Sequence, residues 1–195
     1  PIPDFTLPAD GNATVSCIAD AVVPTAPEVL DACGELVQPL MSASQDPLCE
    51  GQKVYTFSYT NCSGAPKNWT FTYNIVLPAF TIATPAGAAT VDCIADAIAP
   101  SAAALPVVMD ACNNLLTPMA APQRIESPSP ISCEGNITYR YTYRDCAGHE
   151  ATWDFVYTIE LAPFSITAAA GSATVDCIAD AVLPSVALLP VVEDN

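Results

Sequence analysis

Residues 49–75 read CEGQKVYTFSYTNCSGAPKNWTFTYNI, and residues 133–159 read CEGNITYRYTYRDCAGHEATWDFVYTI. In both stretches aromatic or branched side chains occupy every second position on either side of a turn that contains Cys and Gly. This period of two, carried by aromatic and β-branched residues, is the pattern of a half-buried β-strand. Each stretch therefore predicts a β-hairpin whose aromatic face points inward and supplies much of a core.

The hairpins belong to a longer internal repeat. The nine residues ATVSCIADA at 13–21 recur as ATVDCIADA at 89–97 and again at 173–181. From the Cys that opens each hairpin onward, the landmarks of the first two copies are offset by 84 residues. Differences in length fall between the first and third Cys of each copy, which predicts loops there. The chain therefore divides into tandem repeats at residues 1–79, 80–163 and, incompletely, 164–195.

The third copy stops early. The chain ends at Asp194-Asn195, where the pattern Asp110-Ala111-Cys112 of the second copy would place a Cys next. We therefore expect this chain to be a segment of a longer tandem array.

Shorter strands are expected in the first half of each repeat. Residues 5–7 and 13–18 flank the turn signal Asp10-Gly11, and residues 80–84 and 89–94 flank a similar one. The Pro-containing stretch 19–30 predicts an extended crossing. Residues 97–105 are rich in Ala, but a helix there is excluded because Pro100 and Pro106 lie too close together. Short strands at regular spacing predict an all-β chain of small β-sandwiches in a linear array.

The charge balance excludes several classes of partner. The chain has 21 acidic and 5 basic residues, a net charge of −16 and a pI of about 4.1. Nucleic acids and anionic membrane surfaces are bound through clustered Lys and Arg, so neither is an expected partner. No apolar run reaches the length of a membrane span. The expected partners are neighbouring repeats of the same chain and other copies in a fibre.

Nine Cys accompany a single His. Zinc sites usually show CxxC pairs or His ligands, and the sequence contains neither pattern. Many Cys without metal spacing indicate disulfide bonds and export to an oxidising, extracellular space.

The distance between cysteines limits which of the four Cys in each repeat can form a disulfide. The strand between Cys49 and Cys62 spans about 23 Å, whereas the Cα atoms of a disulfide lie within about 7 Å. That pairing and its counterpart in the second repeat are therefore disfavoured. Bonds between repeats stay open as an alternative. The favoured pairs within repeats are Cys17–Cys49, Cys33–Cys62, Cys93–Cys133 and Cys112–Cys146.

The sequence offers little for catalysis or for metals. His149 stands in a turn without a motif that ties it to a nucleophile. The recurring acids are candidates for calcium at domain junctions, since Ca²⁺ takes six to eight oxygen ligands. Capping of turns by Asp is the favoured interpretation, because no compact DxDxDG run occurs. We therefore expect no enzyme and no cofactor; the calcium candidates are Asp20, Asp31, Asp96, Asp110 and Asp180.

Together these landmarks resemble a known family. Cys-Ile-Ala-Asp at 17–20 and Asp-Ala-Cys-Gly at 31–34 are similar to the Cys-Pro-Ala-Asp and Asp-Asn-Cys-Gly of hyalin-type (HYR) repeats. Trp69-Thr70-Phe71-Thr72-Tyr73 resembles their closing strand, and Cys-Glu-Gly resembles the four-Cys version found in giant secreted proteins of Bacteroidota. Ile18 replaces the usual Pro, and a Cys that some HYR repeats carry in the closing strand is missing.

The resemblance implies immunoglobulin-like sandwiches at the cell surface with an adhesive or structural role. In gliding members of that phylum, such proteins are exported by the type IX system and act as adhesins. A ligand-binding module that uses the unequal loops at 33–49 and 112–133 is the alternative function.

Overall fold

The computed structural model describes residues 5–31, 33–60, 64–164, 166 and 168–192. These residues form two compact units. The first contains residues 1–85, 105–121 and 141–153, and the second contains residues 86–104, 122–140 and 154–195. The strands are β1 (Gly11–Val15), β2 (Leu40–Ala43), β3 (Gly51–Thr60), β4 (Pro66–Ile75), β5 (Gly87–Val91), β6 (Val108–Met109), β7 (Leu115–Leu116), β8 (Gln123–Ser127), β9 (Gly135–Arg144) and β10 (Glu150–Ile159).

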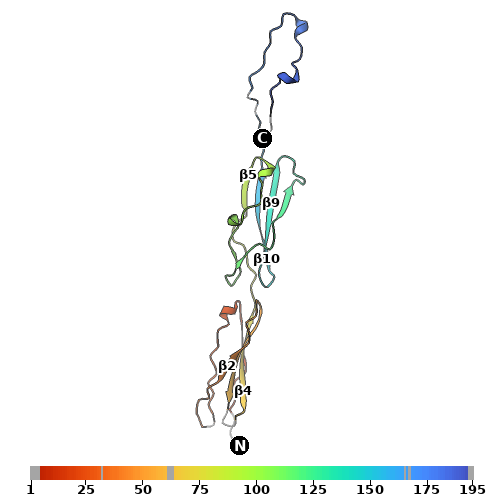
Figure 1. The fold of residues 1–195 in the computed structure, drawn as a ribbon. Coiled ribbons are helices and arrows are strands. Elements are labelled where there is room, and N and C mark those ends of the chain that lie inside the picture. Colours follow the sequence, from red (N-terminus) through yellow and green to blue (C-terminus); the bar gives the residue numbers. More distant parts are fainter. Residues whose placement is uncertain (1–4, 32, 61–63, 165, 167, 193–195) are drawn as a thin grey trace. The chain divides into compact units, whose positions relative to one another are not determined.

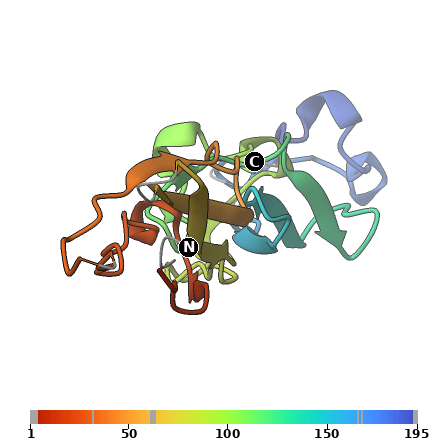
Figure 2. The same cartoon turned by 90° about the horizontal axis from the view of Figure 1, so that it is seen from below.

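Two four-stranded sheets confirm the all-β prediction. Their strand orders are β1-β4-β3-β2 and β5-β10-β9-β8, and β6 and β7 form a further small sheet. The first sheet is coloured from red to yellow in Figure 1, and Figure 2 gives the same strands from below. Five single turns of 3₁₀ helix complete the described regular structure: η1 (Ile18–Asp20), η2 (Ile94–Asp96), η3 (Ala102–Ala104), η4 (Ile178–Asp180) and η5 (Val186–Leu188).

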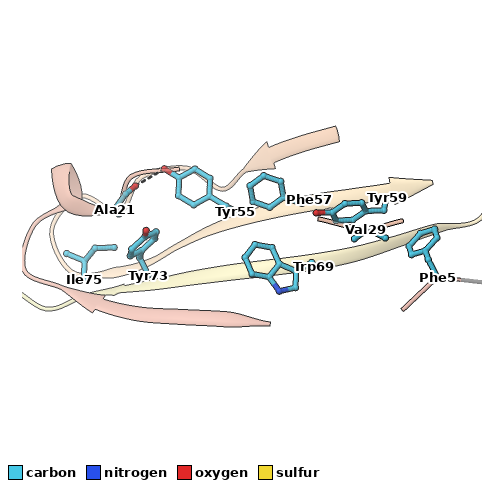
Figure 3. Close-up of a cluster of buried hydrophobic side chains, with 9 residues drawn as sticks. All are labelled: Phe5, Ala21, Val29, Tyr55, Phe57, Tyr59, Trp69, Tyr73 and Ile75. Atoms are coloured by element: carbon cyan, nitrogen blue, oxygen red, sulfur yellow. Dashed lines mark hydrogen bonds between the residues drawn. The ribbon is translucent and has the colours of Figure 1, made fainter. Parts of the chain in front are cut away.

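The predicted hairpins are the centre of both sheets. β3 pairs antiparallel with β4 over its whole length, from Gly51 opposite Ile75 to Thr60 opposite Pro66. The aromatic face is buried as predicted, because hydrophobic side chains alternate with polar ones that point away from the core. Figure 3 shows the core of the first sheet, which contains Phe5, Ala21, Val29, Tyr55, Phe57, Tyr59, Trp69, Tyr73 and Ile75.

Extended chain covers the aromatic face of the first sheet. The Tyr55 hydroxyl donates to the Ala21 carbonyl at 2.7 Å, and the Tyr59 hydroxyl donates to the Pro27 carbonyl at 2.6 Å. These bonds satisfy polar groups that would otherwise be costly to bury. The crossing predicted at 19–30 is therefore one layer of the core. The second repeat contains the counterpart of the Tyr55 bond, since the Tyr139 hydroxyl donates to the Ala97 carbonyl at 2.7 Å.

The predicted strands at 5–7 and 80–84 are wrong. β1 pairs parallel with β4, and β5 pairs parallel with β10, so neither belongs to a local hairpin. Phe5 instead packs against Tyr59, with ring centroids 6.3 Å apart. Asp10, predicted to lie in a hairpin turn, accepts a hydrogen bond from the backbone N–H of Thr70 at 2.7 Å. Contacts with residues that are distant in sequence therefore determine the structure of this segment.

The stretches predicted as loops contain edge strands. β2 pairs with β3, and β8 pairs with β9, both antiparallel. All four residues of β2 are exposed, so their sequence shows no alternation that could reveal a strand. The Ala-rich stretch 97–105 contains only the single turn η3, in agreement with the exclusion of an α-helix.

Candidate functional site

Two disulfide bonds join the first repeat to the second. Cys17 is bonded to Cys112, with Cα atoms 5.6 Å apart and a sequence separation of 95. Cys49 is bonded to Cys146, with Cα atoms 5.7 Å apart and a separation of 97. All four belong to the same compact unit. We call these two bonds, with the turns that carry them, the disulfide junction.

The predicted pairing within each repeat is wrong. Cys17 and Cys49 are bonded to the second repeat and not to each other. Cys112 and Cys146 are likewise bonded to the first repeat and not to each other. The remaining predicted pairs are not formed either, because Cys33, Cys93 and Cys133 are free thiols, as is Cys177. Cys62 lies outside the described residues.

The sheet explains why cysteines bond across the junction. Val15 and Gly51 both lie opposite Ile75, the last residue of β4. Cys17 follows β1 and Cys49 precedes β3, so both lie at the end of the first sheet where the chain leaves for the second repeat. Cysteines at one end of a repeat can bond to each other or to cysteines of the next repeat. The sequence pattern within one repeat does not distinguish these two pairings. The short connection 77–80 was the available signal, because it leaves no spacer between repeats.

A hydrogen-bonded turn holds Cys112 in place. Asp110 is buried, and its Oδ1 accepts from the backbone N–H groups of Cys112 and Asn114, both at 2.8 Å. The Asn114 side chain donates to Asp110 Oδ2 at 2.8 Å. Asn113 has φ of 64°, in the left-handed region that Asn tolerates better than most residues. The sequence Asp-Ala-Cys thus encodes a rigid turn that presents its thiol.

The turn that carries Cys146 also depends on an aspartate. Asp145 is buried and accepts from the His149 backbone N–H at 2.8 Å, and its Oδ2 lies 2.8 Å from His149 Nδ1. Burial opposes the ionisation of Asp145, but hydrogen bonds from the side chain and backbone of His149, with the charge of that ring, hold the pKa of the carboxyl below its usual value. His149 therefore contributes to the hairpin turn beside the junction.

The recurring acids form no shared site. Asp31 accepts from the backbone N–H groups of Cys33 and Glu35, which matches the role of Asp110 in turn capping. Asp20, Asp96 and Asp180 each end a separate 3₁₀ turn. Among the described residues, no three potential metal ligands gather in a group that could hold an ion. The expectation about calcium stays a prediction.

A small cavity lies against the disulfide junction. Its volume is about 170 Å³, and all four bonded cysteines line it together with Ile18. Pockets for small molecules usually measure roughly 300–1,000 Å³. The sulfurs also contact backbone across the junction, with Cys17 Sγ 3.7 Å from the Ala111 carbonyl oxygen and Cys112 Sγ 3.5 Å from that of Ser16. The arrangement is suited to joining two repeats and is small for a ligand.

Residues 5–75 and 81–159 each match the model of the HYR-like domain with 4 cysteines, so this chain belongs to that family. A search of curated proteins found no match. The family is non-catalytic, and its domains are typical of extracellular adhesive and structural repeat proteins. Disulfide-bonded domains of this kind indicate an extracellular protein. No helix in the described part of the chain is long and apolar enough to cross a membrane. The exact limits of the three repeats stay a prediction.

Proposed function

We propose that this chain is a segment of a stiff extracellular stalk whose consecutive repeats are joined covalently. The disulfide junction is the observation that carries the proposal. In most tandem arrays only the linker peptide connects neighbouring domains, and relative motion is the default. Here two further covalent bonds supplement the connection, so bending and separation of the repeats both meet resistance.

The two bonds also limit how far the chain can be stretched. Tension applied to the termini passes along residues 17–49 and then through the Cys49–Cys146 bond. Because of that bond, residues 50–145, which include β3, β4, β5 and β9, are bypassed and add no length between the termini. The Cys17–Cys112 bond bypasses a similar stretch, so either bond alone keeps most of the repeat pair from unravelling.

A cell-surface adhesin of Bacteroidota is the setting we propose for this stalk. The resemblance of the repeat landmarks to those of giant surface proteins supports it, as does the strong negative charge, which keeps neighbouring stalks apart and soluble. Other repeats of the same chain are the partners we propose. Antibodies against this chain should label intact cells of the source organism, and labelling should vanish when type IX secretion is inactivated. Labelling only after lysis would contradict the surface location.

Single-molecule pulling of the 195-residue chain tests the mechanical role. We expect the oxidised chain to reach a final extension roughly 300 Å shorter than the reduced chain, because residues 50–145 stay behind the bonds. The double variant Cys49→Ser/Cys146→Ser should extend almost as little as the wild type. Only the loss of both bonds, by substituting Cys17 and Cys112 as well, should release the full length. Equal extensions with and without reductant would overturn the proposal.

The alternative function, a ligand-binding module, finds less support. The cavity described above lies at the disulfide junction, and of the two unequal loops it touches only a few terminal residues. Part of the loop at 112–133 instead forms β7 (2 residues) and the edge strand β8 (5 residues). We therefore favour the stalk.

A further inference from the structure

The two bonds of the disulfide junction differ in their exposure to solvent. Cys146 is exposed, whereas Cys17, Cys49 and Cys112 are half-buried. The Cys49–Cys146 bond therefore contains one exposed cysteine, and the Cys17–Cys112 bond contains none. Exposed disulfides are the labile ones in proteins, and access helps to decide which sulfur a thiolate attacks.

Backbone from both repeats packs against the Cys17–Cys112 bond. Cys17 Sγ lies 3.7 Å from the Ala111 carbonyl oxygen, and Cys112 Sγ lies 3.5 Å from the Ser16 carbonyl oxygen. The turn of Cys112 is closed by Asp110, which is itself buried. A thiolate that attacks this bond must reach a sulfur that backbone of the other repeat already contacts.

The turn of Cys146 is more open to solvent. The neighbouring Asp145 is buried, but 38% of the side chain of its partner His149 is exposed. The side chains of Arg144 and Glu150, on either side of the turn, are 51% and 52% exposed. An external thiol therefore has access to Cys146 from solvent.

We infer that Cys49–Cys146 is the thiol-sensitive bond of the disulfide junction, opened by attack of an external thiol at Cys146 while the Cys17–Cys112 bond stays closed. The chemical class of the partner is a thiol, either a small molecule or the reactive cysteine of a thiol oxidoreductase. The junction is thus a redox-sensitive device with one labile bond and one protected bond.

The reaction is a thiol–disulfide exchange in two steps. An external thiolate attacks Cys146 Sγ, the S–S bond breaks, and Cys49 leaves as a thiolate. A second external thiolate attacks the external sulfur of the mixed disulfide, and Cys146 leaves as a thiolate. Two external thiols are oxidised to one disulfide, the protein disulfide is reduced to two thiols, and the two protons of the external thiols end on the protein.

Opening this bond changes the bending of the proposed stalk more than its length. With both bonds closed, the linker peptide and the two disulfides hold the repeats at three separate points, which resist rotation about every axis. With Cys17–Cys112 alone, residues 18–111 stay bypassed, but the repeats can rotate about the line that joins the two remaining points. The stalk then bends while its maximum extension stays nearly unchanged.

Only this mechanical meaning rests on the proposed function. The order in which the bonds open rests on the exposure and packing of the cysteines. Equal extensions with and without reductant in the pulling experiment would therefore overturn the stalk and leave the order of opening in place.

Peptide mapping during mild reduction tests the order of opening. The test uses the full chain with five substitutions outside the junction: Cys33→Ser, Cys62→Ser, Cys93→Ser, Cys133→Ser and Cys177→Ser. The uncharged thiol β-mercaptoethanol is added, samples are quenched with N-ethylmaleimide, and the non-reduced peptides are followed by mass spectrometry. We expect Cys49–Cys146 to open about tenfold faster than Cys17–Cys112, and a ratio below about threefold would overturn the inference.

Two double variants show whether the slower bond is slow only because it opens second. Cys49→Ser/Cys146→Ser leaves Cys17–Cys112 as the bond of the junction, and its opening should stay slow. Cys17→Ser/Cys112→Ser leaves Cys49–Cys146, and its opening should stay fast. Equal rates in these two variants would show that exposure does not set the order, which would also overturn the inference.

A turn variant tests what protects the slower bond. Asp110→Ala removes the acceptor that closes the turn of Cys112. It should speed the opening of Cys17–Cys112 severalfold and leave the opening of Cys49–Cys146 unchanged. The matched control is Asp31→Ala, which removes the same acceptor from the turn at residues 31–35 outside the junction and should change neither rate. An unchanged rate for Cys17–Cys112 in Asp110→Ala, or equal acceleration of both bonds, would contradict the protection of that bond by its turn.

Discussion

The same nine-residue motif forms different structures in the second and third copies. Residues 87–91 form the strand β5, and residues 11–15 form β1 in the first copy, whereas residues 171–175 are not in a strand. The 3₁₀ turn that follows the motif's cysteine forms in all three copies. One part of the motif therefore depends on its surroundings, and the other does not.

The difference lies in the range of the hydrogen bonds. The turn is closed by a bond between close neighbours, such as Asp180 N–H to Cys177 O at 3.0 Å. The strand needs a partner that lies about 60 residues further along, since Gly11 pairs with Phe71. For the third copy, the residues equivalent to β4 and β10 are not part of this sequence. A strand is thus a property of the whole repeat, and the turn is a property of four residues.

Removal of the side chain that anchors β1 should have the largest effect. Trp69 packs between Phe57 and Phe71, and its Nε1 donates to the Ala9 carbonyl at 2.8 Å. Trp69→Ala should destabilise the first repeat by about 3–5 kcal/mol. Hydrogen exchange at residues 11–15 should approach the fast exchange expected for residues 171–175. Trp69→Phe, which keeps an aromatic ring, should destabilise the repeat less. Full protection of β1 from exchange in Trp69→Ala would refute the claim that Trp69 anchors this strand.

A smaller effect is expected from one methyl group placed at the same position of two copies. A Cβ on Gly11 would lie 2.3 Å from a ring carbon of Phe71, whereas a Cβ on Gly171 would meet no atom within 4 Å. Gly11→Ala should therefore cost about 1–3 kcal/mol, measured by urea unfolding. Gly171→Ala should change stability by less than about 0.5 kcal/mol. Equal costs in both variants would contradict the claim that, of these two positions, only Gly11 lies in a packed strand.

The smallest effect concerns a local turn and its pH dependence. The pKa of Asp145 is lowered in the folded state, so its stabilisation is present above the unfolded pKa of about 3.9 and is lost as the pH falls through the folded value. The urea midpoint of the second repeat, followed by Trp153 fluorescence, should fall slightly between pH 6 and pH 2. Asp145→Asn should flatten this change. An unchanged slope in that variant would exclude Asp145 as its source.

Much of the fold could be predicted from alternation alone. The aromatic residues of β3 and β4 mark both strands and the face they bury, because a strand with one buried face must alternate. The edge strand β2 lacks that signal, because its four residues are all exposed. The parallel pairing of β1 with β4 also escaped prediction, because Asp10-Gly11 looks like a hairpin turn while its partner is distant.

The turns of the disulfide junction could be predicted from the sequence, but the pairing of its cysteines could not. Asp31 and Asp110 were predicted to cap turns, and the geometry of both turns agrees with that role. The bonds of Cys17 and Cys49 to another repeat depend on where two sheets end, which no pattern within one repeat records.

Repeat period, strand alternation and turn chemistry follow from the residues themselves, because each depends on neighbours a few positions apart. The pairing of cysteines, the parallel edge strand and the crossing that covers the core depend on which distant segments meet. The Cys17–Cys112 bond shows this most clearly, since its two residues are 95 positions apart and come within 5.6 Å only when the first sheet and the turn at Asp110 have both formed.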